Sequence, residues 1–220
     1  MNQMIFMTGG TGYLGRPLAE RLLAKGQSVR LLVRPGSERK APSGADVVVG
    51  DPMNPRSFQD EIPSGGVFVQ LLGTPKPAPW KGKEFEQVDG RSALASIQAA
   101  CTAGVRRFVY VSVAHPAPVM KSYIRVRSQC ERALVESGLT YTILRPWYVL
   151  GTGHWWPYSL LPFYWIAKSI PSARGNALRL GLVTHPQMVA ALEWAVLAKD
   201  SANQVLDVPA IRRVAAGDSV

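Results

Sequence analysis

The stretch Met4-Ile5-Phe6-Met7-Thr8-Gly9-Gly10-Thr11-Gly12-Tyr13-Leu14-Gly15 joins a short apolar run to a glycine-rich turn, and a helical pattern follows at once. Gly9 permits a tight turn off the strand, Gly12 lets a pyrophosphate approach the backbone, and Gly15 allows the helix to pack closely on the strand. The unpaired amides and positive dipole of the helix N-terminus then face the phosphates. Because the glycines follow a strand and open a helix, they predict a dinucleotide site rather than an ordinary glycine turn.

Length and charge bound the remaining possibilities. The chain has 220 residues, which is enough for one domain with a full core, or for one domain with a small appended lobe. Its formal net charge of +10 would suit nucleic acid, an acidic membrane or phosphorylated ligands. The Lys and Arg residues are dispersed, and no nucleic-acid motif accompanies them. We therefore expect no nucleic-acid partner and interpret the charge as a basic surface with a few phosphate-facing arginines.

The sequence gives no sign of export, membrane insertion or metal binding. The N-terminus lacks a basic region followed by an apolar run, and prolines interrupt the most apolar tract, residues 147–166. Cys101 and Cys130 have no ligand spacing and are interpreted as reduced residues. The three histidines are scattered and form no metal motif. We expect a cytoplasmic protein with no metal site and no stable membrane insertion.

A helical pattern, a terminating glycine and an apolar strand follow one another three times along the chain. The glycines are Gly26, Gly104 and Gly138. This alternation predicts parallel strands connected by crossover helices, and hence an α/β fold with a doubly wound parallel sheet. The predicted strands are residues 4–8, 28–34, 47–49, 67–72, 107–111 and 141–144. The run 204–208 could add another strand.

The pattern changes after Arg145, so we divide the chain into a dinucleotide-binding core, residues 1–145, and a smaller substrate-side lobe, residues 146–220, packed on that core. In the lobe, Thr184 is a plausible N-cap for a helix over residues 186–198. Aromatic side chains of the lobe could wall a pocket for an apolar or ring-shaped substrate, although core packing is the alternative for each of them. These are Trp147, Tyr148, Trp155, Trp156 and Tyr158.

Several stretches of the first 150 residues resemble the short-chain dehydrogenase/reductase superfamily in its atypical NAD(P)-binding branch. They are residues 8–15, 33–35, 50–52, 103–112 and 137–146. The resemblance implies three groups of cofactor contacts. The residues implied are Gly9, Thr11, Gly12, Tyr13, Leu14 and Gly15 at the pyrophosphate, Asp51 at the adenine amine, and Leu71, Leu72 and Gly73 beside the nicotinamide-side ribose. Asp51 could alternatively be a turn residue before Pro52.

The choice of nicotinamide cofactor depends on the end of the second predicted strand. NAD-specific sites carry an acidic residue there, which takes the ribose hydroxyls. Here the position holds Arg34, with Arg39 and Lys40 close behind. Because a guanidinium can pair bidentately with a 2′-phosphate, we predict NADP as the cofactor, with NAD as the alternative. A solvated basic loop would also explain these residues.

The resemblance also implies catalytic residues: a tyrosine, a lysine four residues later on the same helix, and a serine at the end of the preceding strand. The pKa of a free tyrosine is about 10, so a nearby cation is needed to stabilise its phenolate. Tyr123 matches the tyrosine, but Arg127 stands at the lysine position. Arg127 keeps the charge and would share the contact with the cofactor ribose. Alternatively, it forms an exposed helix pair with Glu131.

The serine position is altered as well. Val113 stands where the superfamily usually has serine or threonine, and Ser112 lies one residue earlier. Neighbouring strand residues point to opposite faces, so Ser112 can substitute only if the strand is already turning. His115 in the following loop is an alternative donor.

Two functions from different classes fit these residues. The leading hypothesis is an NADP-dependent oxidoreductase or epimerase/dehydratase-like enzyme on a small organic substrate, with Tyr123 as proton donor or acceptor. The rival is a non-catalytic NADP(H)-binding protein, acting as a redox sensor or in the assembly of a larger complex. Because two of the three catalytic positions are altered, the sequence supports cofactor binding more strongly than hydride transfer.

Overall fold

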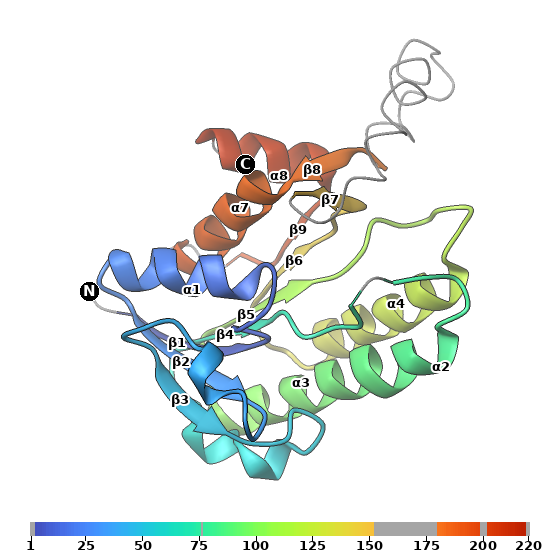
Figure 1. Ribbon diagram of the computed structural model, residues 1–220. Coiled ribbons are helices and arrows are strands. Elements are labelled where there is room, and N and C mark those ends of the chain that lie inside the picture. The colour runs from blue at the N-terminus through green and yellow to red at the C-terminus, as the bar shows by residue number, and fades with distance from the viewer. Residues whose placement is uncertain (1–2, 76, 152–179, 199–201, 219–220) are drawn as a thin grey trace.

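In the part of the chain that the structure describes, seven parallel strands form one sheet in the order β3-β2-β1-β4-β5-β6-β9 (Figure 1). The computed structural model describes residues 3–75, 77–151, 180–198 and 202–218. The strands are β1 (Met4–Thr8), β2 (Ser28–Val33), β3 (Asp46–Val49), β4 (Val67–Gln70), β5 (Arg107–Val111), β6 (Tyr141–Leu144) and β9 (Gln204–Leu206). The predicted doubly wound α/β fold is thereby confirmed, and the run at 204–208 supplies the seventh strand.

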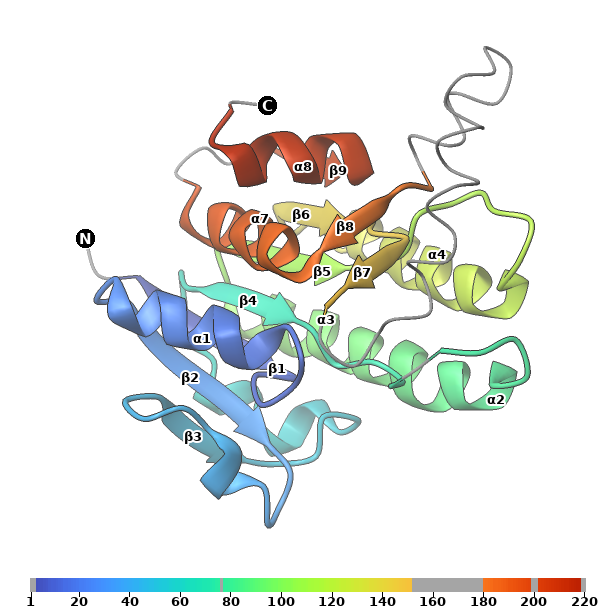
Figure 2. The ribbon, with the colours of Figure 1, turned by 45° about the horizontal axis from the view of Figure 1, so that its top comes forward.

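Helices cover both faces of this sheet (Figure 2). α1, α7 and α8 pack on one face, and α3 and α4 on the other. Their bounds are α1 (Gly15–Ala24), α2 (Gly82–Glu84), α3 (Arg91–Ala103), α4 (Lys121–Glu136), α7 (His185–Leu197) and α8 (Val208–Ala216), with 3₁₀ turns at Glu38–Lys40, Pro55–Ser57 and Gln59–Glu61. Because parallel strands need crossovers, α1, α3 and α4 each run back against the strand direction.

Side chains of successive strand residues enter two separate apolar cores. Ile5 and Met7 pack into the core under α1 and α7, whereas Phe6 packs into the core under α3 and α4. On that second face Phe6, Phe68 and Phe108 form a row across β1, β4 and β5. Their ring centroids are 5.3 and 5.0 Å apart. Burial on both faces explains why these strands are almost continuously apolar.

Glycines and a cap end and begin the helices as the sequence predicts. Gly104 and Gly138 follow α3 and α4 with φ values of +65° and +75°, in the left-handed region that glycine adopts without strain. The side chain of Thr184 accepts a hydrogen bond from the Gln187 amide, and Gln187 completes a capping box at the start of α7. The helix predicted over 186–198 is confirmed as His185–Leu197.

Further helical turns precede α3. From Gly82 to Ala103 the chain is helical throughout, and its middle is a π-helical turn, η4 (Phe85–Gly90). Such turns are rare and occur frequently at functional sites. The turn contains Asp89, whose exposed fraction is 0%.

The described part of the C-terminal region shares the core of the sheet. β7 (Tyr148–Leu150) and β8 (Leu182–Thr184) pair in parallel as a separate two-stranded sheet. β9 instead joins the main sheet beside β6, and Val183, Leu192 and Val208 belong to the same apolar core as β1. Among the described residues, no helix combines the length and the apolar character needed to cross a membrane.

Candidate functional site

The predicted site residues meet at the carboxyl edge of the sheet. Strand order reverses at β1, which lies between β2 and β4, and a doubly wound sheet binds its ligands at such a point. The glycine turn follows β1, Leu71 to Gly73 follow β4, and Ser112 follows β5 directly. The two ends of the predicted dinucleotide site come from separate stretches of the sequence. They therefore follow neighbouring strands of the sheet, β1 and β4.

The glycine turn packs tightly against the exit of β4. Gly9 has a φ of +70°, as expected for a tight turn, and a Cβ on Gly9 would come within 2.8 Å of the Leu71 and Leu72 backbone. A Cβ on Gly15 would come within 2.8 Å of the Gly10 Cα. The close packing that Gly15 permits is thus against the turn itself. Both positions require glycine for the fold.

Gly12 differs from these two glycines and fits the phosphate group of a dinucleotide. Its amide donates to the Gly9 carbonyl oxygen at 3.0 Å. A Cβ on Gly12 would meet that same oxygen at 3.2 Å and, its chain neighbours aside, no other atom of the described residues within 4 Å. The backbone here is open, and it lies at the N-terminus of α1, where amides and the helix dipole favour an anion.

A second helix supports the glycine turn from the other side. The His185 ring lies 4.4 Å from the Tyr13 ring, centroid to centroid, and His185 Nε2 is 2.8 Å from the Tyr13 carbonyl oxygen. A Cβ on Gly151 would strike the Tyr13 hydroxyl and reach within 3.0 Å of His185 Cβ. The start of α7 and the end of β7 therefore hold the turn in place.

The two residues predicted to contact the adenosine half are exposed. Arg34 follows β2, and its carbonyl accepts a hydrogen bond from the Ser37 amide at 3.0 Å. Asp51 Oδ1 accepts from the Met53 amide at 2.9 Å, and the Asp51 amide donates to Ser57 Oγ at 3.0 Å. These bonds make Asp51 a turn residue. Its contact with adenine stays a prediction.

Arg127 is buried, and the alternative prediction of an exposed ion pair with Glu131 is wrong. Its side chain is 7% exposed, and its Nη2 donates to Asp89 Oδ1 at 2.5 Å. Its Nη1 donates to the Val111 carbonyl oxygen at 2.8 Å and to the Tyr110 hydroxyl at 3.2 Å. Three of the five N–H donors of this guanidinium are therefore engaged by the protein. Burial would lower the pKa of Arg127, but Tyr110, Tyr123 and Asp89 outweigh it, so the side chain stays charged.

Tyr123 lies one helical turn from Arg127, as the spacing predicts. The Arg127 Cζ is 5.1 Å from the centroid of the Tyr123 ring, which is a cation–π distance. On its other side the ring contacts Phe85, with centroids 4.8 Å apart. Burial raises the pKa of Tyr123; the charge of Arg127 opposes that rise, and the charge of Asp89 adds to it. At neutral pH the side chain is a protonated phenol.

Ser112 lies just past the strand, but the hydrogen bonds to the chain after β6 continue through Ser112 to Ala114, so its role at the serine position stays a prediction. β5 ends at Val111, and the Ser112 amide donates to the Leu144 carbonyl oxygen at 2.8 Å. Its hydroxyl is buried and makes no hydrogen bond of ordinary geometry within the described part of the chain, and the same holds for Arg127 Nε. Such orphaned polar atoms are costly. Because the Ser112 hydroxyl also lies beside Glu131 and lowers its pKa, Arg127 Nε is the stronger sign of a polar ligand at this edge.

Sequence reasoning missed a second charged cluster at this edge. Arg145 Nε donates to Glu131 Oε1 at 3.0 Å, and His115 Nε2 lies 3.4 Å from Glu131 Oε2. Burial would raise the pKa of Glu131, but hydrogen bonding from Arg145, the nearby Ser112 hydroxyl and the surrounding positive charge lower it overall. A hollow of about 370 Å³ opens beside these side chains. His115 thus faces Glu131.

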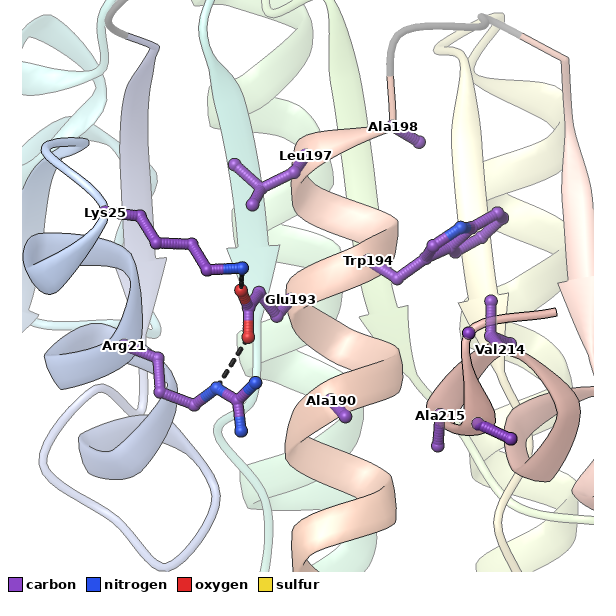
Figure 3. Close-up of a pocket in the computed structure, with 11 residues that line it drawn as sticks. Arg21, Lys25, Ala190, Glu193, Trp194, Leu197, Ala198, Val214 and Ala215 are labelled. Atoms are coloured by element: carbon purple, nitrogen blue, oxygen red, sulfur yellow. Dashed lines mark hydrogen bonds and ion pairs between the residues drawn. The ribbon is translucent and has the colours of Figure 1, made fainter. Parts of the chain in front are cut away.

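Of the aromatic residues predicted to wall a pocket, Trp147 and Tyr148 contact each other, with ring centroids 5.3 Å apart. Trp155, Trp156 and Tyr158 lie outside the described residues. A larger cavity of about 520 Å³ lies elsewhere, where Glu193 of α7 binds Arg21 and Lys25 at the end of α1 (Figure 3). Because Lys25 precedes the start of β2, this cavity is at the opposite, amino edge of the sheet and is separate from the predicted cofactor site.

The open glycine turn and its place at the reversal of strand order are features of a nicotinamide dinucleotide site. The profile of a protein family described as NAD(P)H-binding matches residues 9–152. The chain belongs to this NAD(P)H-binding family. A short-chain dehydrogenase/reductase superfamily protein of Agrobacterium tumefaciens, solved with NAD, superposes with a TM-score of 0.67 at 19% identity over 95% of this chain and 80% of that chain, which shows a shared fold.

This NAD(P)H-binding protein is 30% identical over 152 residues to ceramide reductase of Caulobacter vibrioides, covering 68% of this chain and 47% of that protein. It is 32% identical over 146 residues to Photosystem II assembly factor Ycf39 of Cyanophora paradoxa, covering 64% and 44%. The chain spans about half the length of these relatives. The UDP-glucose 4-epimerase of Thermus thermophilus, solved with NAD, superposes with a TM-score of 0.68 at 16% identity over 98% of this chain and 84% of that chain. Such low identity shows a shared fold.

Proposed function

We propose that this NAD(P)H-binding protein is an NADP(H)-dependent oxidoreductase that reduces a carbonyl group of a small organic substrate. The contact between Tyr123 and Arg127 beside Gly73 carries the proposal, because it supplies a proton donor and a cation next to the turn predicted to line the nicotinamide-side ribose. When bound, a reduced nicotinamide cofactor would supply a hydride to the carbonyl carbon. Tyr123 would donate its phenol proton to the oxygen, giving an alcohol, and would recover a proton from water.

The environment of Tyr123 suits the reductive direction. Burial raises the pKa of Tyr123, so the free enzyme holds the proton that reduction consumes. Arg127 would stabilise the phenolate that remains after the transfer, and the buried hydroxyl of Ser112, just past β5, would bind the substrate oxygen. The name of the relative ceramide reductase agrees with a reductive reaction.

Arg34 supports NADP(H) as the cofactor. It is exposed directly after β2, where a guanidinium can pair bidentately with a 2′-phosphate. An acidic residue would be needed there for selective binding of NAD.

A second function is favoured by one observation. Asp89 lies 2.5 Å from Arg127 and cancels its charge. Arg127 therefore stabilises the phenolate of Tyr123 less than the superfamily's usual lysine would. A protein that binds NADP(H) without catalysis, and assists the assembly of a partner complex, would tolerate this arrangement. The name of the relative Ycf39, an assembly factor, agrees with that function.

The deciding experiment is NADPH oxidation with a panel of aldehydes and ketones, with alcohol product measured in parallel. Tyr123→Phe should lower kcat by about 10²–10⁴-fold, the usual contribution of a general acid, and leave NADPH binding intact. Tyr141→Phe serves as the control, because it removes a phenol at the start of β6, at the amino edge of the sheet and away from the predicted site. NADPH binding without turnover of any carbonyl, or turnover that Tyr123→Phe leaves unchanged, would favour the non-catalytic protein.

A further inference from the structure

Asp89 connects three parts of the site, and no sequence motif marks it. One carboxylate oxygen, Oδ1, accepts from Arg127 Nη2 at 2.5 Å. The other, Oδ2, accepts from the Thr74 amide at 3.0 Å and from the Thr74 hydroxyl at 2.5 Å. Its side chain is fully buried. A carboxylate of η4 thereby ties α4 to the turn that leaves β4.

The ion pair between Asp89 and Arg127 packs directly against the backbone of Gly73. A Cβ on Gly73 would lie 2.5 Å from Arg127 Nη2 and 2.9 Å from Asp89 Oδ1. The ion pair is therefore in contact with the backbone predicted to line the nicotinamide-side ribose. Any movement of the pair would move that backbone.

The charge of Arg127 has two candidate counterions. Asp89 supplies one as a buried carboxylate, and Tyr123 could supply the other as a phenolate. Within the described part of the chain, Tyr110 of β5 and Cys130 of α4 are further titratable neighbours; burial raises the pKa of each, so neither carries a negative charge at neutral pH. Because a buried guanidinium needs one negative partner, the carboxylate and the phenolate compete for the same role.

We propose that Asp89 is a positioning residue: it holds Arg127 against Gly73 and cancels its charge, so that Tyr123 remains a protonated donor and the site favours reduction at neutral pH. The direction of the pKa shift on Tyr123 agrees, since Asp89 raises it. This inference rests on the proposed function for its catalytic consequence. Its electrostatic consequence concerns Tyr123 alone and is measurable without any substrate.

The test is the ionisation of Tyr123 in the full chain, followed by ultraviolet difference titration against the Tyr123→Phe form of each variant. In Asp89→Asn the phenolate becomes the counterion of Arg127, so Tyr123 should ionise at lower pH than in the wild type. Glu86→Gln is the matched control, because it removes one negative charge from the exposed ion pair that joins η4 to α4, Glu86 Oε1 to Arg125 Nη2 at 2.6 Å. It should leave the titration unchanged.

The activity of the same variants separates the two proposals. For each pH unit that the titration moves, the phenolate fraction at neutral pH rises about tenfold, and oxidation of the product alcohol by NADP should rise with it. A shifted titration without turnover in either direction would contradict the proposed reductase and support the role of Asp89. If Tyr123 ionises at the same pH in Asp89→Asn, in Glu86→Gln and in the wild type, the role of Asp89 is refuted.

Asp89→Asn leaves a buried guanidinium without its carboxylate, which destabilises a fold strongly. A second variant therefore keeps the proposal testable if Asp89→Asn does not fold. Asp89→Asn combined with Arg127→Gln replaces the ion pair by two neutral amides of similar shape. If Asp89 acts by cancelling the charge of Arg127, Tyr123 in the double variant should ionise at nearly the same pH as in the wild type. That pH should be well above the pH at which Tyr123 ionises in the single variant Asp89→Asn. Ionisation of the double variant far below the wild-type pH would overturn the proposal.

Discussion

His185 Nε2 lies 2.8 Å from the carbonyl oxygen of Tyr13, and the two rings contact each other at 4.4 Å between centroids. A carbonyl oxygen accepts, so Nε2 is the protonated nitrogen of His185. The two residues are far apart in sequence, yet the first turn of α7 fixes the backbone of the glycine turn. The C-terminal part of the chain therefore helps to shape the predicted phosphate end of the cofactor site.

His185→Ala should weaken cofactor binding. Loss of one hydrogen bond and one ring contact costs about 1 kcal/mol, which corresponds to roughly a fivefold increase in the Kd of NADPH, measured by fluorescence titration. His115→Ala is the control, because that imidazole faces Glu131 instead. An unchanged Kd in His185→Ala would mean that the glycine turn holds its shape without α7.

Gly12→Ala and Gly15→Ala should separate binding from folding. A Cβ on Gly12 meets one carbonyl oxygen at 3.2 Å, so the melting temperature should fall little while the affinity for NADPH falls by ~10-fold or more as the methyl group obstructs the phosphate. In Gly15→Ala the Cβ would press on the Gly10 backbone at 2.8 Å, and overpacking costs about 1–3 kcal/mol. Thermal unfolding and NADPH titration of both variants check this. Equal loss of stability in the two would contradict it.

Arg34→Ala should raise the Kd of NADPH and leave that of NADH within twofold or so, since only NADPH has a 2′-phosphate to pair with the guanidinium. A lost charge-assisted contact of about 1.5–3 kcal/mol corresponds to a 10- to 150-fold change. Isothermal titration with each cofactor measures both values. Arg39→Ala, in the short 3₁₀ turn that follows, tests whether the loop acts through Arg34 alone. Equal affinities of the wild type for NADH and NADPH would refute the preference for NADP.

Glu131 should make the fold sensitive to acid. Its pKa is lower in the folded chain than the ordinary glutamate value, because Arg145 and Ser112 outweigh burial. The unfolded chain then binds more protons at acidic pH, so the stabilisation is complete above the unfolded pKa of about 4.3 and is lost as the pH falls through the folded pKa. In urea unfolding, the free energy of the wild type should decline more steeply below about pH 5 than that of Glu131→Gln. Parallel profiles would show that the Arg145 pair contributes nothing.

Much of the fold was predictable because its signals are local. Glycines after helical patterns marked the helix ends, and apolar runs marked the strands, since buried parallel strands need no polar face. The strands ended one or two residues early where the site begins: β2 stops at Val33 and β4 at Gln70. There the backbone leaves the sheet to form the turns that are predicted to contact the cofactor.

The interior of the site was less predictable. Arg127 and Glu131 are four residues apart on α4, a spacing that predicts a helix pair, but each pairs with a residue distant in sequence, Asp89 and Arg145. Tertiary packing decides such pairings, and a single sequence carries no signal for them. The sequence likewise does not mark Asp89, because its burial was visible only in the fold.

The parallel arrangement of the sheet has a consequence for encounter kinetics. Because α1, α3 and α4 all run against the strands, their N-termini point toward the carboxyl edge, and their dipoles add there. Together with a net charge of +10, this field attracts a polyanion from a distance comparable to the Debye length, about 8 Å at physiological salt. A dinucleotide would thus be guided to the correct edge before it touches the glycine turn, and its capture would slow as salt is added.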